Sequence, residues 1–296
     1  MEIQEYLGLI FSKLNNINSY VYGMFHRIGG DKISKKFWYY FFYFLSKRCL
    51  TYGTKGLKNL VSLGLDSNHV YNIGNAIDEK KIVKIKKKLN NNLKIFKSLK
   101  KKFPNLNSNI VLQVVRMSII KRPLLLVEAA KTLLKKRSDV SFVIIGEGEL
   151  FDKFNKLVKK YKLDNFFIIL KNLYDENQLA KWFLVSKCLV VPACIGLTIH
   201  HAFAYGVPVI TDDDDITQSS ESELLKNGYN GLRYKSNNSA DLSSKINLIL
   251  KKNKLQNKMS KNAFKTLHVN YKLEDKVARF IKEIDYKNKL WKKKSY

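Results

Sequence analysis

Proline, glycine and cysteine are all scarce in this chain of 296 residues. Four prolines and 14 glycines exclude collagen-like and linker-rich architectures. The three cysteines, Cys49, Cys188 and Cys194, are odd in number and stand in apolar surroundings. This pattern favours free thiols in a reducing compartment over a disulfide framework. Hydrophobic residues still make up 45% of the chain, which is enough to bury a large core and excludes an intrinsically disordered protein.

Acidic residues are few as well, because 25 Asp and Glu stand against 54 Lys and Arg. The net charge of +29 indicates attraction to an anionic partner such as nucleic acid, an acidic lipid surface or a phosphorylated substrate. Asn, Lys and Ile are abundant everywhere, so a coding sequence biased toward A and T explains the charge equally well. The cations are scattered and no motif that reads RNA or DNA is visible, so we expect no specific nucleic acid. A basic nucleic-acid-binding protein stays as an alternative.

Long hydrophobic runs and a secretory signal are also missing. The most apolar segment, residues 37–45, is far shorter than the ~18 residues of a membrane-spanning helix. Lysine and arginine flank this segment, so it is either a core helix or a helix lying in the plane of a membrane surface. The basic residues 289–296 are either solvated or a tether to anionic lipid. We therefore expect a cytoplasmic protein, with peripheral attachment to the inner membrane face as an option.

Short apolar segments alternate with helical segments through the middle of the chain. Segments of strand length and composition are residues 109–117, 140–145, 166–170, 189–191 and 207–211. Segments with helical spacing of apolar residues are 124–137, 149–163, 175–185 and 196–205. Asp175 and Gln178 form a capping box at the start of one of them. The alternation predicts an α/β fold, in which βαβ units build a doubly wound parallel sheet covered on both faces.

The pattern is weaker outside this block. Residues 1–78 are aromatic and helical in character, with candidate strands at 20–25 and 69–73. We expect four parts, which are a partial N-terminal domain (1–78), a basic helix and linker (79–108), a Rossmann-like domain (109–271) and a C-terminal basic helix (272–296).

A glycine turn separates the expected strand at residues 189–191 from the helix that follows it. Gly196 allows a tight turn, after which the N–H groups of Leu197 and Thr198 would face outward as a ready anion site. Ligands of open α/β sheets lie at the carboxyl ends of the strands, where this turn is expected. A plain strand–helix turn would use the glycine equally well, so both interpretations stay open.

Several segments together resemble the retaining GT-B glycosyltransferases of the group 1, family 4 class. Residues 196–211, GLTIHHAFAYGVPVIT, resemble the family's donor-binding segment, in a branch with His in place of Glu. Arg116 and Lys121 resemble its Arg and Lys pair that neutralises the donor diphosphate. Further matching segments are IGEGEL at 145–150, NAID at 75–78, and residues 219–223 followed by two Asn-Gly pairs. Together the matches cover about residues 37–270.

The resemblance implies transfer of a hexose-type sugar from a nucleotide-sugar donor to a glycan or lipid-linked acceptor, with retention at the anomeric carbon. It implies catalytic roles for Arg116 and Lys121, and for His26 in a segment that resembles the family's "HG.G" loop. Taken alone, His26 is as well explained as a packed or surface residue. The implied donor-binding residues are Gly146, Glu147, Gly196, Leu197, Thr198, His201 and Glu221. His201 would contact the ribose, and Gly146 and Glu147 would line the nucleotide side.

The sequence also departs from the family pattern. Ala193 and His201 stand where the family has two acids, Val115 replaces a glycine and Ser220 replaces a proline. Residues 1–78 are too few for a complete acceptor-side domain, so a catalytically dead remnant, or a subunit that needs a partner chain, remains an alternative. The run Asp212 to Asp215 has the DxD spacing of metal sites in a different glycosyltransferase fold. The resembled family binds no metal there, so we expect neither a metal ion nor a cofactor.

Overall fold

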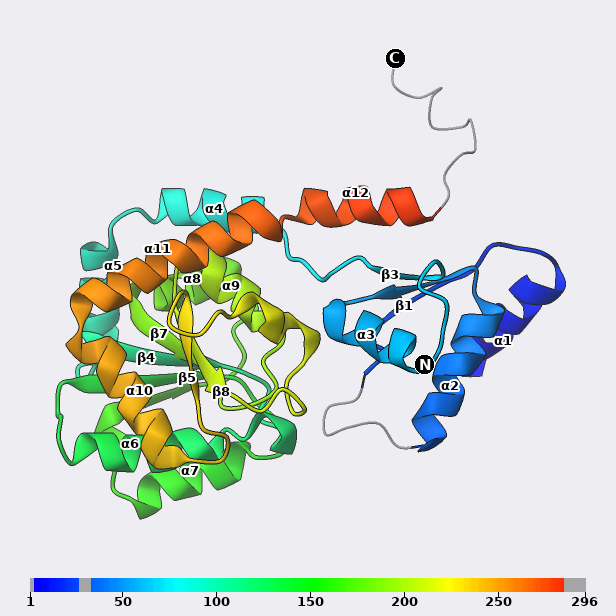
Figure 1. Cartoon of the computed structure of the whole chain (residues 1–296). Helices are drawn as coiled ribbons and strands as arrows, with labels where there is room; N and C mark the ends of the chain where they lie inside the picture. The colour runs from blue at the N-terminus through cyan, green and yellow to red at the C-terminus, as the bar shows by residue number, and fades with distance from the viewer. Residues whose placement is uncertain (1–2, 27–32, 285–296) are drawn as a thin grey trace. The chain divides into compact units, whose positions relative to one another are not determined.

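The computed structural model describes residues 3–26 and 33–284. The chain divides into two compact units (Figure 1). Unit 1 comprises Met1–Ala76 and Tyr271–Tyr296, and unit 2 comprises Ile77–Asn270. Each unit is built around its own parallel sheet.

Unit 2 holds a six-stranded sheet in the order β6-β5-β4-β7-β8-β9, in which all neighbouring strands run parallel. The strands are β4 (Asn109–Val114), β5 (Val140–Ile145), β6 (Phe167–Leu170), β7 (Ser186–Val190), β8 (Val209–Asp212) and β9 (Gly231–Tyr234). The chain first moves outward in one direction from β4 and then returns to its other side at β7. This is the strand order of a Rossmann-like domain, and it leaves a topological switch point between β4 and β7.

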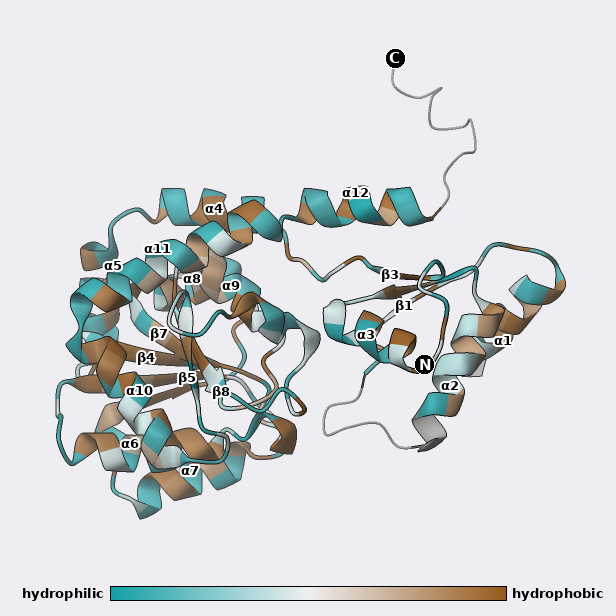
Figure 2. Cartoon of the chain, viewed as in Figure 1, coloured by the Kyte–Doolittle hydropathy of each residue, from teal (hydrophilic) through white to brown (hydrophobic). Residues whose placement is uncertain are grey.

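Helices cover both faces of this sheet (Figure 1). One layer contains α6 (Leu124–Leu134), α7 (Phe151–Lys160) and α10 (Ser239–Lys251). The other contains α4 (Glu79–Lys88), α5 (Asn92–Lys102), α8 (Glu176–Val185), α9 (Thr198–Tyr205) and α11 (Asn253–Asn270). Most residues of the strands are apolar (Figure 2), as expected for a sheet that is covered on both faces, and every residue of β5 is buried.

The predicted α/β class and parallel sheet are confirmed, and the five expected strands match β4 to β8 with shifts at their ends. The sixth strand, β9, was not predicted. This strand is only four residues long. It begins at Gly231, which lies so close to β8 that a Cβ atom there would overlap the Val209 carbonyl oxygen. Residues 79–108 form two helices, α4 and α5, whose first turns are capped by the side chains of Asp78 and Asn91.

Unit 1 contains a three-stranded parallel sheet in the order β1-β2-β3. Its strands are β1 (Tyr20–Gly23), β2 (Arg48–Thr51) and β3 (Val70–Asn72), and its helices are α1 (Ile3–Leu14), α2 (Ile33–Leu45), α3 (Thr54–Ser62) and α12 (Leu273–Glu283). The two predicted strands correspond to β1 and β3, whereas the central strand β2 was missed. Cys49 and Leu50 of β2 are fully buried.

The C-terminal helix α12 packs on the strands of unit 1. The Arg279 side chain donates to the Ile73 carbonyl oxygen at 2.9 Å, Tyr20 donates to the Ile284 carbonyl oxygen at 2.6 Å, and Arg48 pairs with Glu283. A helix was predicted over residues 272–296. The structure describes α12 within this range, and α12 belongs to unit 1. The basic segment 289–296 lies outside the described residues.

Among the helices that the structure describes, none combines the length and the apolar character that crossing a bilayer requires. The segment at residues 37–45 forms the larger part of α2.

Candidate functional site

A pocket of about 320 Å³ opens at the switch point of unit 2, at the carboxyl ends of its strands. Its walls come from the loop after β4, the loop after β6 and the first turns of α9. The lining residues are Val114, Val115, Arg116, Ile145, Asn172, Leu173, Tyr174, Leu179, Phe183, Leu197, Thr198 and His201. Four of the predicted site residues, Arg116, Leu197, Thr198 and His201, therefore meet at one pocket.

Gly146 and Gly148 allow the loop after β4 to lie against the end of β5. Both have positive φ, and a Cβ atom on Gly146 would overlap the Val115 carbonyl oxygen. A Cβ atom on Gly148 would lie 2.8 Å from the Met117 carbonyl oxygen. Because of this close approach, the Val115 and Met117 amides donate to the carbonyl oxygens of Ile145 and Glu147. The glycines thus determine the path of the segment that carries Arg116.

Lys121 lies against the turn that connects β7 to α9. Its ammonium donates to the Cys194 carbonyl oxygen, and its Nζ is 3.6 Å from the Cys194 Sγ. A Cβ atom on Gly196 would lie 3.8 Å from the same Nζ. Cys194 has a φ of +51°, so the chain enters this turn in the left-handed region. Burial raises the pKa of the Cys194 thiol, although nearby Lys121 opposes the increase.

The turn presents unpaired backbone donors at the start of α9. Within the described ranges, the N–H groups of Gly196, Leu197 and Thr198 donate to no protein acceptor. The Thr198 hydroxyl donates to the Val114 carbonyl oxygen at 3.2 Å, which ties the first turn of α9 to the end of β4. Three N–H groups, the Lys121 ammonium and the positive end of a helix dipole therefore lie at one strand end, where they favour an anion.

The two residues before the 3₁₀ helix η3 (Ser220–Leu224) bind this turn. Gln218, which is fully buried, accepts from the Ile195 amide at 2.8 Å, and Ser219 donates to the Ile195 carbonyl oxygen. Glu221 is buried in η3, and its charge acts on the Cys194 thiol. Glu221 therefore lies on the Cys194 side of the turn and does not line the pocket itself.

His201 lies in the pocket wall beside the half-buried carboxylate of Glu176. Its Nδ1 is 3.6 Å from the Glu176 Oε1, which also accepts from the Tyr205 hydroxyl at 2.8 Å. Its ring is parallel to that of Phe183 at a centroid distance of 6.3 Å. Burial alone would raise the pKa of Glu176, but His201 and Tyr205 outweigh it, so the pKa is lowered. Glu176 therefore carries a negative charge beside the imidazole, at a separation longer than a hydrogen bond.

Glu147 lies beside the pocket at the end of β5. Its carboxylate accepts from Asn172 at 3.0 Å and lies 3.6 Å from the Lys171 ammonium. Asn172 belongs to the pocket wall, together with Tyr174, whose side chain is 90% exposed. Residues 172–174 were not predicted, because this loop has no motif and joins the site only through the position of β6.

The four carboxylates of residues 212–215 all bind groups of the protein, and Asp212 and Asp213 share Ser236. Asp212 is buried and pairs with Arg122 at 3.1 Å while accepting from Gln218 and Ser236. Of the other three, Asp213 accepts from the Ser236 amide, Asp214 from the Ile216 amide, and Asp215 from Arg233. Within residues 3–26 and 33–284, no three His, Cys, Asp or Glu side chains gather closely enough to hold a metal ion.

His26 lies in unit 1 and so is not part of the pocket in unit 2. It is half-buried, with its Nδ1 3.0 Å from the Met24 carbonyl oxygen. The preceding residue, Phe25, has a positive φ of +49°. The following part of the segment that resembles the "HG.G" loop, residues 27–30, lies outside the described residues.

Comparison with known proteins gives a consistent result. Residues 94–266, more than half of the chain, match the family described as "Glycosyl transferases group 1". An uncharacterized glycosyltransferase of Methanocaldococcus jannaschii is 28% identical over 141 residues, which are 47% of this chain and 37% of that protein. The match thus spans little more than a third of the curated relative's length.

Two solved structures share the fold over nearly the whole chain. HepE from Anabaena, in complex with UDP, has a TM-score of 0.76 and 15% identity, and the match covers 94% of this chain and 74% of HepE. A glycosyltransferase from Rickettsia africae has a TM-score of 0.72 and 19% identity over 94% of this chain and 79% of its own. At such identities the likeness shows the fold alone.

Proposed function

The chain belongs to the group 1 glycosyl transferases, and on that premise we propose that it transfers a hexose-type sugar from a nucleotide-sugar donor to a glycan or lipid-linked acceptor. One observation carries the proposal. Lys121 lies against the turn between β7 and α9, where three backbone N–H groups have no acceptor within the described chain, at the switch point of the sheet. Ligands of such sheets bind at this place.

In this proposal, the donor diphosphate binds at the turn. The N–H groups of Gly196, Leu197 and Thr198 donate to phosphate oxygens, and Lys121 and Arg116 supply positive charge. When the sugar leaves, negative charge builds up on the diphosphate, and preorganised donors and cations stabilise that charge. Lys121 is held in place by the Cys194 carbonyl oxygen, so it loses little side-chain freedom on binding.

The nucleoside occupies the pocket of about 320 Å³ in this proposal. His201, which lies beside the Glu176 carboxylate, contacts the ribose hydroxyls, since an imidazole N–H or N can take part in hydrogen bonds with them. Gly146 and Glu147 lie on the nucleotide side, where Glu147 holds Asn172 of the pocket wall. The exposed ring of Tyr174 offers a flat face for a base. HepE was solved with UDP and with UDP-glucose, so uridine donors are the first to test.

We propose that donor binding requires neither a metal ion nor a cofactor. Arg116, Lys121 and the N–H groups provide the positive charge that a divalent cation would otherwise supply. The carboxylates with DxD spacing are each bound to an arginine, a hydroxyl or a backbone amide, so they do not converge on a shared position. Glu221 is buried in η3, and we propose that it supports the donor site without touching the donor.

The transfer step is proposed to proceed with retention and to depend on groups beyond unit 2. Effective transfer needs the acceptor hydroxyl oriented at the anomeric carbon, which contributes roughly 7–11 kcal/mol. Unit 1, which carries His26, has three strands within its described residues, compared with six in unit 2. We therefore propose that the isolated chain binds donor but transfers sugar slowly, and that a partner chain can supply further acceptor contacts.

The exposed apolar surface of unit 1 supports peripheral attachment to an anionic membrane on the cytoplasmic side. Phe11 of α1 is 60% exposed, and Phe37 and Phe44 of α2 are 65% and 64% exposed. The chain also carries a net charge of +29. Apolar rings that enter the lipid interface and cations that meet lipid phosphates reinforce each other.

The proposed function is tested by calorimetric titration of UDP, GDP and their hexose conjugates, with and without EDTA. We expect micromolar to millimolar binding of at least one nucleotide, unchanged by EDTA. Product formed with a lipid-linked or glycan acceptor is then analysed by NMR for its anomeric configuration. An absence of binding by every nucleotide contradicts the proposal, and an inverted product contradicts retention alone.

A further inference from the structure

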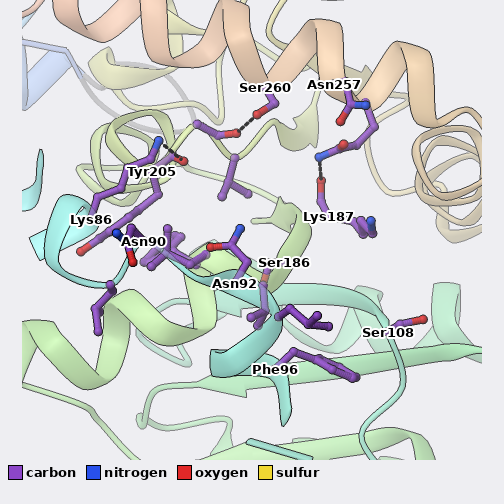
Figure 3. A pocket seen from close by; sticks show the side chains of 18 residues that line it. Lys86, Asn90, Asn92, Phe96, Ser108, Ser186, Lys187, Tyr205, Asn257 and Ser260 are labelled. Atoms are coloured by element: carbon purple, nitrogen blue, oxygen red, sulfur yellow. Dashed lines mark hydrogen bonds between the residues drawn. The ribbon is translucent and has the colours of Figure 1, made fainter. Parts of the chain in front are cut away.

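Unit 2 contains a second cavity, of about 720 Å³, at the opposite edge of its sheet (Figure 3). Ser108 immediately precedes β4, Ser186 is the first residue of β7, and Val207 lies just before β8. These residues place the cavity at the amino ends of the strands, whereas the proposed donor pocket is at their carboxyl ends. Its size is in the usual range for small-molecule sites.

Two ammonium groups line this cavity, Lys86 from α4 and Lys187 from β7, and none of its lining residues is acidic. Lys86 donates to the Tyr205 carbonyl oxygen at 2.9 Å, and its Nζ lies 4.5 Å from the centre of the Phe264 ring. These contacts hold the Lys86 side chain but provide no negative charge. The Lys187 side chain is half-buried and has no hydrogen-bond partner within the described chain. An anion in the cavity would therefore meet two cations and no carboxylate.

The polar side chains of the cavity fall into two groups. The first group builds the wall, because Gln256 donates to the Lys187 carbonyl oxygen at 3.1 Å and Ser260 to the Gly206 carbonyl oxygen at 2.5 Å (Figure 3). The second group has open hydrogen-bonding capacity within the described part of the chain, and its members are Asn90, Asn92, Ser108 and Asn257. Amides and a hydroxyl both donate and accept, as a partner with several hydroxyl groups requires.

An apolar surface completes the cavity. Phe96 and Leu93 of α5 line it near Asn92, and the Leu93 side chain is 66% exposed. The carbon-bound hydrogens of a sugar ring pack well on such side chains, whereas a compact inorganic anion would leave them uncovered.

We propose that this cavity binds a carbohydrate that carries a carboxylate or a phosphate group. Lys187 and Lys86 bind the anionic group, the free amides of Asn90, Asn92 and Asn257 bind the hydroxyls, and Phe96 and Leu93 cover an apolar face of the ring. The cavity opens at the other end of the strands from the proposed donor pocket and shares Phe183 with its wall. Its existence does not depend on the proposed transfer activity.

The test is equilibrium titration of the full chain with four probes, which are glucuronate, glucose 6-phosphate, glucose and inorganic phosphate. At least one of the two charged sugars is expected to bind at least tenfold more tightly than either glucose or inorganic phosphate. Which of them binds identifies the anionic group as a carboxylate or a phosphate. If neither charged sugar exceeds both simple probes, the proposal is wrong.

Variants then locate the binding. Lys187→Ala is expected to weaken binding of the charged sugar about tenfold or more, and Asn92→Ala about threefold or more. Lys84→Ala is the matched control, since Lys84 is an exposed lysine of α4 that does not line the cavity. Thermal melting confirms that each variant is folded.

Lys121→Ala separates the two sites. Affinity for the charged sugar should be retained in this variant, because Lys121 belongs to the donor pocket. Loss of affinity in Lys121→Ala together with unchanged affinity in Lys187→Ala would place the sugar in the donor pocket and overturn the proposal.

Discussion

The two units of this chain use apolar residues differently. In unit 2, six parallel strands lie between two helical layers, and most of their residues are buried, those at the β6 edge less so. Unit 1 has three parallel strands, and many of its large apolar side chains on α1 and α2 remain exposed, including Leu7, Phe11, Phe37 and Phe44. A small sheet buries a smaller fraction of the surface of its chain, so the aromatic residues of unit 1 exceed what its core can accommodate.

Unit 2 also contains a buried network of polar side chains. In unit 2 the buried Asp212 is surrounded by Arg122, Gln218 and Ser236, and this network supports the turn that faces the proposed donor. Unit 1 offers an apolar surface instead, which suits a lipid interface or another chain. We propose that unit 2 binds the donor and that unit 1 provides attachment to a membrane surface.

We expect the largest effect from a substitution at the closely packed strand ends of unit 2. Gly146→Ala should lower the free energy of unfolding of unit 2 by roughly 3–5 kcal/mol, because the new methyl group overlaps the Val115 carbonyl oxygen at a positive φ. Gly8→Ala in unit 1 is the control, since no other atom lies within 4 Å of the position that its new methyl group would take on the exposed face of α1. It should raise stability by about 0.5–1 kcal/mol. Urea denaturation measures both, and similar effects for the two variants would refute the contrast.

The next effect concerns the exposed aromatic residues of unit 1. Replacing Phe11 and Phe44 by serine should reduce binding to anionic vesicles about tenfold or more, since full burial of one such side chain is worth roughly 1.5–3 kcal/mol. Tyr174→Ser in unit 2 removes an aromatic residue that is 90% exposed and should leave vesicle binding unchanged. Vesicle sedimentation measures all three proteins. Equal losses from both units would show that the membrane surface is not confined to unit 1.

The smallest expected effect is the pH dependence that Asp212 contributes. Burial raises the pKa of Asp212 above 3.8, although hydrogen bonds from Gln218 and Ser236 and the charge of Arg122 oppose the increase. The folded chain then keeps a proton that the unfolded chain has lost, so the free energy of unfolding falls as pH rises from about 3.8 through the raised pKa. Each unit of pKa difference corresponds to about 1.4 kcal/mol.

Denaturation of the wild type and Asp212→Asn at several pH values measures this contribution. The stability of the wild type relative to the variant should fall with rising pH over that window. Asp152→Asn removes a carboxylate from the exposed part of α7 and controls for net charge. A wild-type stability that rises against Asp212→Asn over the same window would contradict the direction of the shift.

Much of unit 2 could be predicted from the sequence because its strands are continuous apolar runs. The six residues of β5 match the predicted 140–145, and their burial on both faces is what makes the run uninterrupted. Strands β2 and β9 were missed, since neither is a continuous apolar run: β2 begins with Arg48, and β9 contains Arg233. What makes β9 a strand is its pairing with β8, a contact between segments about 20 residues apart.

Some residues of the candidate site could be predicted from the sequence and others could not. Lys121, Arg116 and the turn at Gly196 could be found because they fall within segments that resemble a known family. Gln218 and Glu176 could not, because each acts through a tertiary contact, with the Ile195 amide and with His201 respectively. Their positions depend on how η3 and α8 pack, which no local pattern encodes.

We propose that the turn between β7 and α9 binds the donor diphosphate together with Lys121. Calorimetric titration of the full chain with UDP tests this assignment, using Lys121→Ala and, as a control, Lys136→Ala, an exposed lysine just beyond the C-terminal end of α6. We expect Lys121→Ala to weaken binding roughly 10- to 150-fold, the equivalent of about 1.5–3 kcal/mol for a charge-assisted hydrogen bond, with Lys136→Ala unchanged. Equal affinity of all three proteins for UDP would contradict the assignment of this turn as the phosphate site.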